Sequence, residues 1–452
     1  MVSPHERAAA GKALRDKIPR EQHRQWNEAE GRPDPIEVLH ASDVGRMEQL
    51  QAIRYGRMLQ SPFAFYRGAA GVMAADLVRT PATGLKVQTC GDCHLLNFGG
   101  FATPERSIIF DINDFDETLP APWEWDIKRL VASIVLAARS NGLADHQGRD
   151  AAISCARKYR EHMRQLSEMG PLQVWYAKTT YVDFLNSLPK RMRRGTKKRI
   201  EEVAARSGSE LEFPKLASSA RGQIRIIDHP PLIFHPEDID SADSAMFDQL
   251  FHDYRGSLSD DRRVLIERFR LIDAAVKVVG VGSVGRRCWI ALMMSEGNDP
   301  LFLQFKEAVT SVLEPYAGKS IYSHQGRRVV MGQHLMQPTS DVFLGWTTAR
   351  NGRHFYVRQL HDAKIKPLVE TFNAEMLDVF AQACGWVLAR AHAKASTISA
   401  TISAYLGSSS DEFDMALGKF ALRYADQAER DHAALRLAVQ QGKIAADQGS
   451  QV

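Results

Sequence analysis

An aspartate and an asparagine five residues apart form the first pattern in this sequence that could carry chemistry. Asp92 and Asn97 lie in the segment 90–97 (CGDCHLLN). A carboxylate can accept the proton of a substrate hydroxyl, and an asparagine oxygen can hold Mg²⁺ on a nucleotide phosphate. Five residues allow one tight loop to direct both groups at the same phosphate. We therefore predict Asp92 as a catalytic base and Asn97 as a metal ligand.

A second acidic segment, 111–117 (DINDFDE), follows a short apolar strand predicted at 107–110. Carboxylate oxygens are hard ligands that suit Mg²⁺. We predict Asp114 as the second metal ligand, and Asp111 as a reserve ligand if the strand register is shifted by one turn. The alternative is an acidic turn that only caps the strand.

A glycine-rich loop separates two strand-like runs at 276–279 and 288–294. Between two strands, such a loop can cover nucleotide phosphates with its backbone amides, whereas a dinucleotide fold would need a helix after it. Lys306 lies on the next strand-like run, where it would neutralise the phosphates. Glu314 is the candidate ion-pair partner of Lys306. The loop residues predicted to bind the nucleotide are Gly280, Gly282, Ser283 and Gly285.

Other chemistry-bearing patterns have simpler interpretations. Cys90 and Cys93 form a C-x-x-C pair, which permits zinc or redox chemistry, but there is no second such pair and no β-α-β pattern around it. Small buried side chains in a tight loop are the favoured interpretation, and His392 is interpreted as a core histidine. The basic run 190–199 is interpreted as a solvated helix face, with a patch for phosphates or an acidic partner as the alternative.

The overall composition excludes several classes of protein. Of 452 residues, 44% are hydrophobic and 25% charged, as in folded globular proteins. The 58 Lys and Arg nearly balance the 54 Asp and Glu, so the net charge of +4 gives no argument for nucleic acid. Apolar runs are far shorter than a membrane span, and the first residues do not resemble a signal peptide. We expect a cytoplasmic protein without a membrane partner, with its five cysteines reduced.

The pattern of elements predicts a mixed α+β protein. Residues 1–60 form a leading helical segment, and 61–145 form the first part of a helical lobe with the catalytic and metal loops. A mainly helical insertion at 146–270 follows, with a helix predicted at 259–275. Residues 276–365 form a small β-rich nucleotide lobe, and 366–452 form C-terminal helices that complete the helical lobe.

These motifs resemble those of aminoglycoside and choline kinase-like phosphotransferases. The segment 91–97 is similar to their G-D-x-H-x-x-N catalytic loop, and 113–116 (NDFD) is similar to their I-D-F-D metal motif. The segment 122–130 resembles their D-P-x-x-D-L-A segment, which implies that Asp126 is a structural support for the catalytic loop. In that family the glycine loop and lysine come first, whereas here they follow the catalytic loop. The resemblance therefore implies a two-lobed protein kinase-like fold in circularly permuted order.

The chain also resembles a bacterial family known as a domain of unknown function, family 2252. The resemblance extends over about residues 45–435, and the family name implies no activity. It is carried by 61–68 (SPFAFYRG), the block 90–130, and 278–286, 301–308 and 355–360.

Together the motifs predict an ATP- and Mg²⁺-dependent phosphotransferase that acts on an unknown hydroxyl-bearing acceptor, either a small molecule or a protein. The backbone of Arg358, Gln359 and Leu360 is expected to contact the adenine. Two alternatives stay open: a non-catalytic, pseudokinase-like nucleotide-binding regulatory module, and transfer of AMP instead of phosphate.

Overall fold

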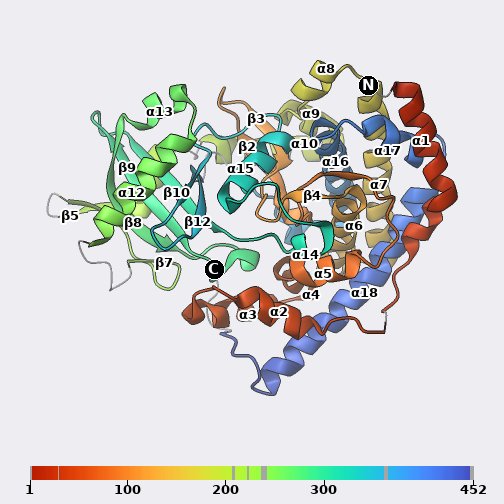
Figure 1. Ribbon diagram of the computed structural model, residues 1–452, viewed down its shortest axis with the longest axis horizontal. Coiled ribbons are helices and arrows are strands. Elements are labelled where there is room, and N and C mark those ends of the chain that lie inside the picture. The colour runs from red at the N-terminus through yellow and green to blue at the C-terminus, as the bar shows by residue number, and fades with distance from the viewer. Residues whose placement is uncertain are drawn as a thin grey trace.

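The computed structural model describes residues 3–28, 30–205, 209–220, 223–235, 242–360 and 365–447. A six-stranded sheet with flanking helices occupies one side of the molecule, and a larger helical part occupies the other (Figure 1). The mixed α+β class expected from the sequence is confirmed.

The sheet is antiparallel, with the strand order β11-β12-β10-β9-β8-β7. Successive residues of a strand point to opposite faces of the sheet, so they pack in two different hydrophobic clusters. Ala291 and Met293 face a cluster with α12 and α13, whereas Ile290 and Leu292 face a second cluster with α11 and β6. Both faces are therefore covered. The strands are β7 (Ile233–Phe234), β8 (Phe269–Lys277), β9 (Cys288–Ser295), β10 (Pro300–Ala308), β11 (Gly345–Thr348) and β12 (His354–Gln359).

Long helices build the core of the helical part. α6 is buried along almost its whole length because it lies between α7, α16 and α18, and it carries apolar residues on several sides. Such a helix needs partners all round it. The helices are α1 (Pro4–Lys17), α6 (Trp123–Ser140), α7 (Asp145–Glu168), α16 (Ala374–Lys394), α17 (Ser399–Leu406) and α18 (Glu412–Gln440).

Shorter elements lie around these two parts. The helices are α2 (Pro35–Asp43), α3 (Gln51–Leu59), α4 (Pro62–Gly68), α5 (Ala70–Leu77), α8 (Pro171–Tyr176), α9 (Tyr181–Ser187), α10 (Lys190–Ala205), α11 (Ser209–Leu216), α12 (Ala242–Ser257), α13 (Asp260–Ile266), α14 (Glu314–Ala317) and α15 (Gln325–Met336). The strands are β1 (Lys86–Thr89), β2 (Phe98–Ala102), β3 (Ile108–Ile112), β4 (Leu119–Pro122), β5 (Ala217–Ala220) and β6 (Gln223–Ile226).

Two small ladders position the predicted catalytic and metal loops. β1 pairs with β4, and β2 pairs with β3 in a register that places Phe98 opposite Ile112. The residues just outside that ladder are therefore neighbours, and the Asn113 N–H donates to the Asn97 carbonyl at 2.8 Å. This register brings the Asn97 and Asp114 segments together.

The segment 146–270 contributes to both parts of the molecule. Its first helix, α7, packs against α6 and α16 in the helical core, while β7 joins the sheet and α12 covers β11. The helix predicted at 259–275 is wrong in its second half, because α13 ends at Ile266 and residues 269–277 form β8. The apolar residues there fit both periods, and pairing with β9 selects the strand.

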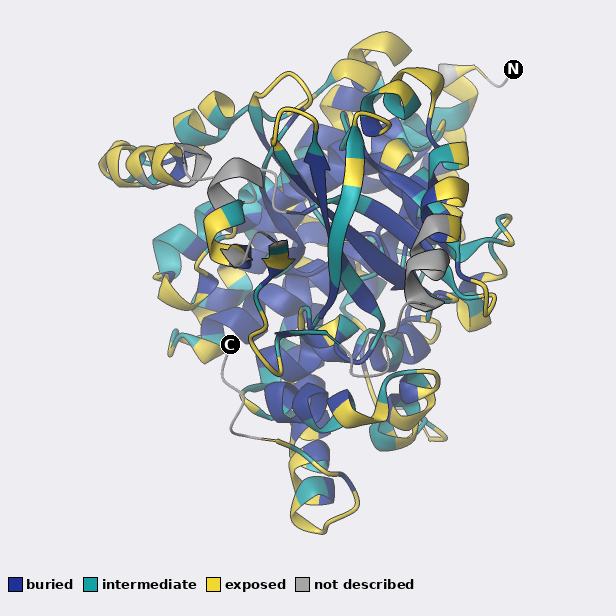
Figure 2. Ribbon diagram, turned by 90° about the vertical axis from the view of Figure 1, so that its left-hand side faces the viewer, coloured by how far each residue is buried: buried dark blue, intermediate teal, exposed yellow. Residues whose placement is uncertain are grey.

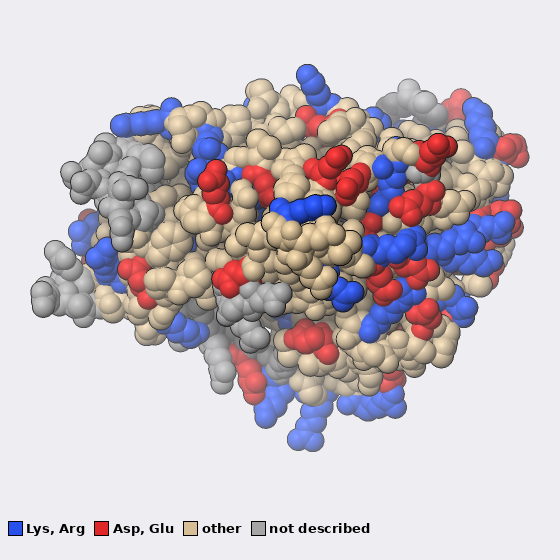
Figure 3. Space-filling model, turned by 90° about the horizontal axis from the view of Figure 1, so that it is seen from below, with Lys and Arg blue, Asp and Glu red and all other residues tan. Residues whose placement is uncertain are grey.

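Burial and charge follow the two-part architecture. The central strands and long helices are buried, and exposed residues lie on the outer helices and loops (Figure 2). The face drawn in Figure 3 carries Lys and Arg next to Asp and Glu, without a large area of one sign. Among the described residues, no helix combines the length and apolar character needed to cross a bilayer.

Candidate functional site

A cavity of about 1170 Å³ is lined by residues from both parts of the molecule. It brings together two groups of segments that are far apart in the sequence. The first group is the predicted catalytic loop (90–97) and the predicted metal loop (111–117). The second is the glycine loop (280–285), the strand that carries Lys306 and the end of β12. Gly285 and Glu314 are not among its lining residues, and Asp126 lies behind the catalytic loop. The predicted site residues that line it are Asp92, Asn97, Asp114, Gly280, Gly282, Ser283, Lys306, Arg358, Gln359 and Leu360.

The catalytic loop is fixed from behind by Asp126 near the N-terminus of α6. Its carboxylate accepts hydrogen bonds from the backbone N–H of Cys90 at 2.8 Å and of Gly91 at 3.0 Å. His392, from α16, lies 3.2 Å from the same carboxylate and 2.9 Å from the Tyr159 hydroxyl. All of these groups are buried, so the loop is held by charge-assisted hydrogen bonds inside the core.

The Asp92 carboxylate faces the cavity next to a buried arginine. Arg129 places its Nε at 2.6 Å and its Nη2 at 2.5 Å from Asp92 Oδ1. The Asn97 side-chain nitrogen donates to the Asp92 carbonyl at 2.6 Å, which leaves the Asn97 side-chain oxygen for the cavity. Burial lowers the pKa of His94 to about 3, so His94 is a neutral neighbour of this carboxylate.

Lys306 is buried on β10 and paired with the metal loop. Its Nζ lies 2.5 Å from Asp116 Oδ2 and 3.7 Å from Asp114 Oδ2. Burial alone would lower the pKa of Lys306, but the carboxylates of Asp114 and Asp116 raise it well above its ordinary value. Asp116 also accepts hydrogen bonds from the Tyr356 hydroxyl at 2.7 Å and from Ser283 Oγ at 3.1 Å. Asp116 thus links the metal loop, the glycine loop and the sheet.

Glu314 does not form the predicted ion pair with Lys306. After β10 the chain turns, and Glu117 holds that turn by accepting from the Val312 N–H at 2.8 Å. Glu314 then begins α14, which packs against β4. Proximity in sequence suggested Glu314, whereas the fold supplies Asp116 from a distant segment.

Asp111 is excluded as a reserve metal ligand because it is an internal ion-pair partner. Arg390, from α16, binds both of its carboxylate oxygens, at 2.5 and 2.7 Å. Both side chains are almost fully buried, and Asp111 is not among the residues that line the cavity. On β3 the Asp111 side chain is buried in the core, whereas Asp114, in the loop after this strand, lines the cavity.

The carbonyl oxygens of the glycine loop are held by two arginines from the N-terminal segment. Arg57 Nη1 donates to the Val279 carbonyl at 2.7 Å, and Arg46 donates to the carbonyls of Gly282, at 2.9 Å, and Val284. A Cβ added at Gly280 would meet no atom within 4 Å, so the loop leaves open space there. A nucleotide phosphate needs such space close to backbone amides.

At the end of β12 the Arg358 side chain and the backbone amides of Gln359 and Leu360 form hydrogen bonds within the protein. Arg358 Nε donates to Gln304 Oε1 at 2.9 Å. The N–H of Leu360 donates to the Phe302 carbonyl at 2.9 Å, and that of Gln359 donates to the Asp341 carboxylate. Two of the three amides expected near adenine therefore already have acceptors within the protein.

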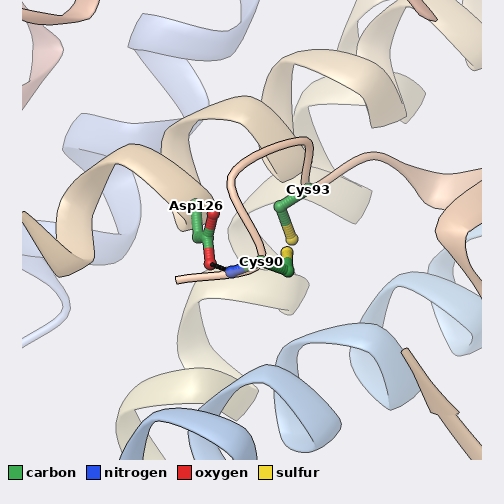
Figure 4. Close-up of side chains that lie close together, drawn as sticks. All are labelled: Cys90, Cys93 and Asp126. Atoms are coloured by element: carbon green, nitrogen blue, oxygen red, sulfur yellow. Dashed lines mark hydrogen bonds between the residues drawn. The ribbon is translucent and has the colours of Figure 1, made fainter. Parts of the chain in front are cut away.

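The C-x-x-C pair forms a buried cluster with Asp126 (Figure 4). Each residue offers one ligand atom, and these atoms lie within 4.8 Å of one another. Burial raises the pKa of Cys93 to about 12 and that of Cys90 well above its ordinary value. Thiolates bind metals, so protonated thiols packed against a hydrogen-bonded carboxylate favour a structural role over zinc or redox chemistry.

The sequence did not predict three residues that contact the site: Arg129, which binds Asp92, Asp116, which binds Lys306, and Tyr356, which donates to Asp116. Arg129 follows Asp126 by three positions, so helical spacing could have placed both on the side of α6 that faces the catalytic loop. The pairing of Asp116 with Lys306 and Tyr356 has no local signal, because it depends on how the sheet meets the metal loop.

Gly91 is expected to tolerate no side chain. Its φ is +83°, and an added Cβ would lie 2.2 Å from the Glu117 carbonyl oxygen. Gly91→Ala should lower the free energy of unfolding by about 3 kcal/mol, the sum of left-handed strain and overpacking. Gly84→Ala is the matched control, since its φ is +79° but no atom lies within 4 Å. It should cost only about 1 kcal/mol. Equal losses in urea unfolding would contradict the close approach.

Fold and cavity together define a mixed α+β protein with a large, highly charged cavity between its sheet and its helical part. The sequence profile of a family described as "Uncharacterized protein conserved in bacteria (DUF2252)" matches residues 46–438, and the chain belongs to this family. Searches of curated proteins and of solved structures gave no match.

Proposed function

We propose that this protein binds Mg·ATP in the central cavity and transfers a phosphoryl group to a hydroxyl of an acceptor. The observation that carries the proposal is that one cavity is lined by four motifs from two distant regions of the chain, 91–116 and 280–306. Each motif has a distinct task in phosphoryl transfer: a carboxylate base, oxygen ligands for a metal, a glycine loop and a buried lysine. Any one of them alone would be weak support.

The residues present fit the nucleotide and the metal ion. Asn97 and Asp114 both line the cavity, on segments joined by the hydrogen bond from the Asn113 N–H to the Asn97 carbonyl, and their side chains offer the oxygen ligands that Mg²⁺ prefers. Bound there, Mg²⁺ would neutralise charge on the phosphates. Lys306 would move part of its contact from Asp116 to the phosphates, and the glycine loop would cover them. The open space at Gly280 provides the room.

Asp92 would then serve as the base in the transfer step. Its carboxylate accepts the proton of the acceptor hydroxyl while that oxygen forms a bond to the γ-phosphorus. The bond between this phosphorus and the bridging oxygen breaks, and ADP leaves with the electron pair. Arg129 is a positioning residue, because it fixes Asp92 from inside the helical part.

The order of these parts supports a kinase-like fold in circularly permuted order. β8, the glycine loop and β9 are followed by Lys306 on β10, and α15 precedes β11 and β12. The catalytic and metal loops come earlier in the chain, and α16 packs against β3, which leads into the metal loop. We also infer that the enzyme is cytoplasmic. Transfer of AMP instead of phosphate is a variant of this proposal, and mass spectrometry of the product would identify it.

A second candidate is a non-catalytic nucleotide-binding module. It is favoured by Arg129, whose two contacts with Asp92 Oδ1 reduce the availability of that oxygen as a proton acceptor. Nucleotide binding without phosphate release or transfer over a broad acceptor panel would support this candidate against the enzyme.

Thermal and urea unfolding with Mg·ATP tests the nucleotide site. At one hundred times its dissociation constant, Mg·ATP should stabilise the wild type by about 2.7 kcal/mol. The gain should be lost with EDTA and much reduced in Asp114→Ala, while Asp16→Ala, an exposed control, keeps it. If the wild type gains nothing at millimolar nucleotide, the proposal is wrong.

A further inference from the structure

Two arginines that line the cavity have buried guanidinium nitrogens without a hydrogen-bond partner in the described part of the chain. Arg57, on α3, is 8% exposed, and its Nε and Nη2 have no hydrogen-bond partner among the described residues. Arg67, on α4, is half-buried, and its buried Nε likewise has no hydrogen-bond partner among the described residues. Its guanidinium carbon lies 5.9 Å from the centroid of the Phe63 ring. Buried polar groups are almost always satisfied, so cationic donors without a protein acceptor at a cavity favour binding of an anion there.

Other arginines of the cavity are more fully engaged within the protein, although the Arg54 Nε also has no partner among the described residues. Arg54 pairs with Asp43 at 2.6 Å, Arg46 holds the glycine loop, and Arg358 donates to Gln304. Burial lowers the pKa values of both Arg57 and Arg67. For Arg57 no carboxylate opposes this effect, and for Arg67 Asp92 and Glu370 oppose it only in part.

The position of Arg67 relates it to the acceptor, while Arg57 lies at the glycine loop that lines the same cavity. Arg67 lies within electrostatic reach of Asp92 and His94, on the catalytic-loop side of the glycine loop. The phosphates of the nucleotide are assigned to Lys306 and the metal loop. The cavity, at about 1170 Å³, exceeds the ~300–1,000 Å³ of a typical single-ligand site, so it has room for a second substrate.

We propose that Arg57 and Arg67 bind an anionic group of the acceptor, a phosphate or a carboxylate, and orient its hydroxyl toward Asp92. The acceptor is therefore an anionic hydroxyl compound. This assignment rests on the proposed phosphotransferase function, and it narrows the substrate class of that site.

The test is titration calorimetry of wild-type protein saturated with Mg²⁺ and a non-hydrolysable ATP analogue. Inorganic phosphate and acetate are titrated in separate arms, and the tighter arm identifies the anion. Because the analogue fills the nucleotide phosphate positions, binding of either anion reports another site. Arg57→Met and Arg67→Met should each weaken that anion at least tenfold, as expected when a charge-assisted hydrogen bond is lost. In Arg67→Met, affinity for the analogue should change by less than about twofold, within ordinary context effects. Arg57→Met is compared on anion affinity alone, because it also removes the hydrogen bond to the Val279 carbonyl in the glycine loop.

Controls separate the possible failures. Arg268→Met, an exposed arginine, should leave anion binding unchanged, and Arg57→Lys and Arg67→Lys, which keep the charge, should restore part of it if a methionine variant unfolds. The inference would be overturned if anion affinity were unchanged in both methionine variants, or if the wild type bound neither anion. An equal loss of analogue and anion affinity in Arg67→Met would overturn it as well. If the wild type binds no analogue, the proposed function fails, and titration without nucleotide still decides whether the arginines bind an anion.

Discussion

Asp92→Asn should reduce turnover by a factor of about 100 or more while nucleotide affinity stays within a few-fold of wild type, because a general base acts in the transition state. The substitution keeps the shape of the side chain, and its oxygen can still accept from Arg129. Asp92 also makes no described contact with the glycine loop or Lys306 that nucleotide binding would require. The loss should therefore fall on the chemical step.

The measurement is phosphate release or transfer from ATP, together with direct titration of the nucleotide. Asp16→Asn, an exposed carboxylate on α1, serves as the control and should leave both unchanged. Turnover that survives in Asp92→Asn, or a parallel loss of turnover and nucleotide affinity, would remove Asp92 from the role of base.

Arg390→Met should lower the free energy of unfolding by about 3–5 kcal/mol, the usual effect of breaking a buried ion pair. The variant leaves the Asp111 carboxylate buried, with the hydrogen bond from the Ile112 N–H, at 2.8 Å, still in place. Arg139→Met is the matched control, because Arg139 pairs with the exposed Asp145 and Asp426. It should cost less than about 1 kcal/mol.

The deficit of Arg390→Met should also depend on pH. Burial raises the pKa of Asp111, and Arg390 opposes that rise. Without Arg390 the pKa rises further, so the folded variant binds a proton that the unfolded chain has released, and stability falls as pH increases. The deficit should be larger at pH 8 than at pH 5 in urea unfolding. A loss below about 1 kcal/mol at both pH values would contradict the prediction, because it would show that removal of Arg390 does not leave Asp111 as a buried charge without compensation.

The sequence alone determined most of what is local. The strand on each side of the glycine loop, the strand that carries Lys306 and the short strands around the catalytic and metal loops follow from runs of apolar residues bounded by glycine and polar residues. It also determined that Asp126 supports the catalytic-loop backbone, through the resemblance of its segment. These features depend on spacing over a few residues, which one-dimensional patterns record.

Only the tertiary structure decided which of these residues meet. Lys306 pairs with Asp116 instead of Glu314, Asp111 pairs with Arg390 in the core, and Arg129 reaches Asp92. It also placed Arg57 and Arg67 at the cavity with guanidinium nitrogens that have no partner among the described residues, a role that the sequence did not predict for either. The physical reason is that ion pairs form between whatever charges the packing of distant elements brings within a few ångströms. Sequence separation carries no information about that packing.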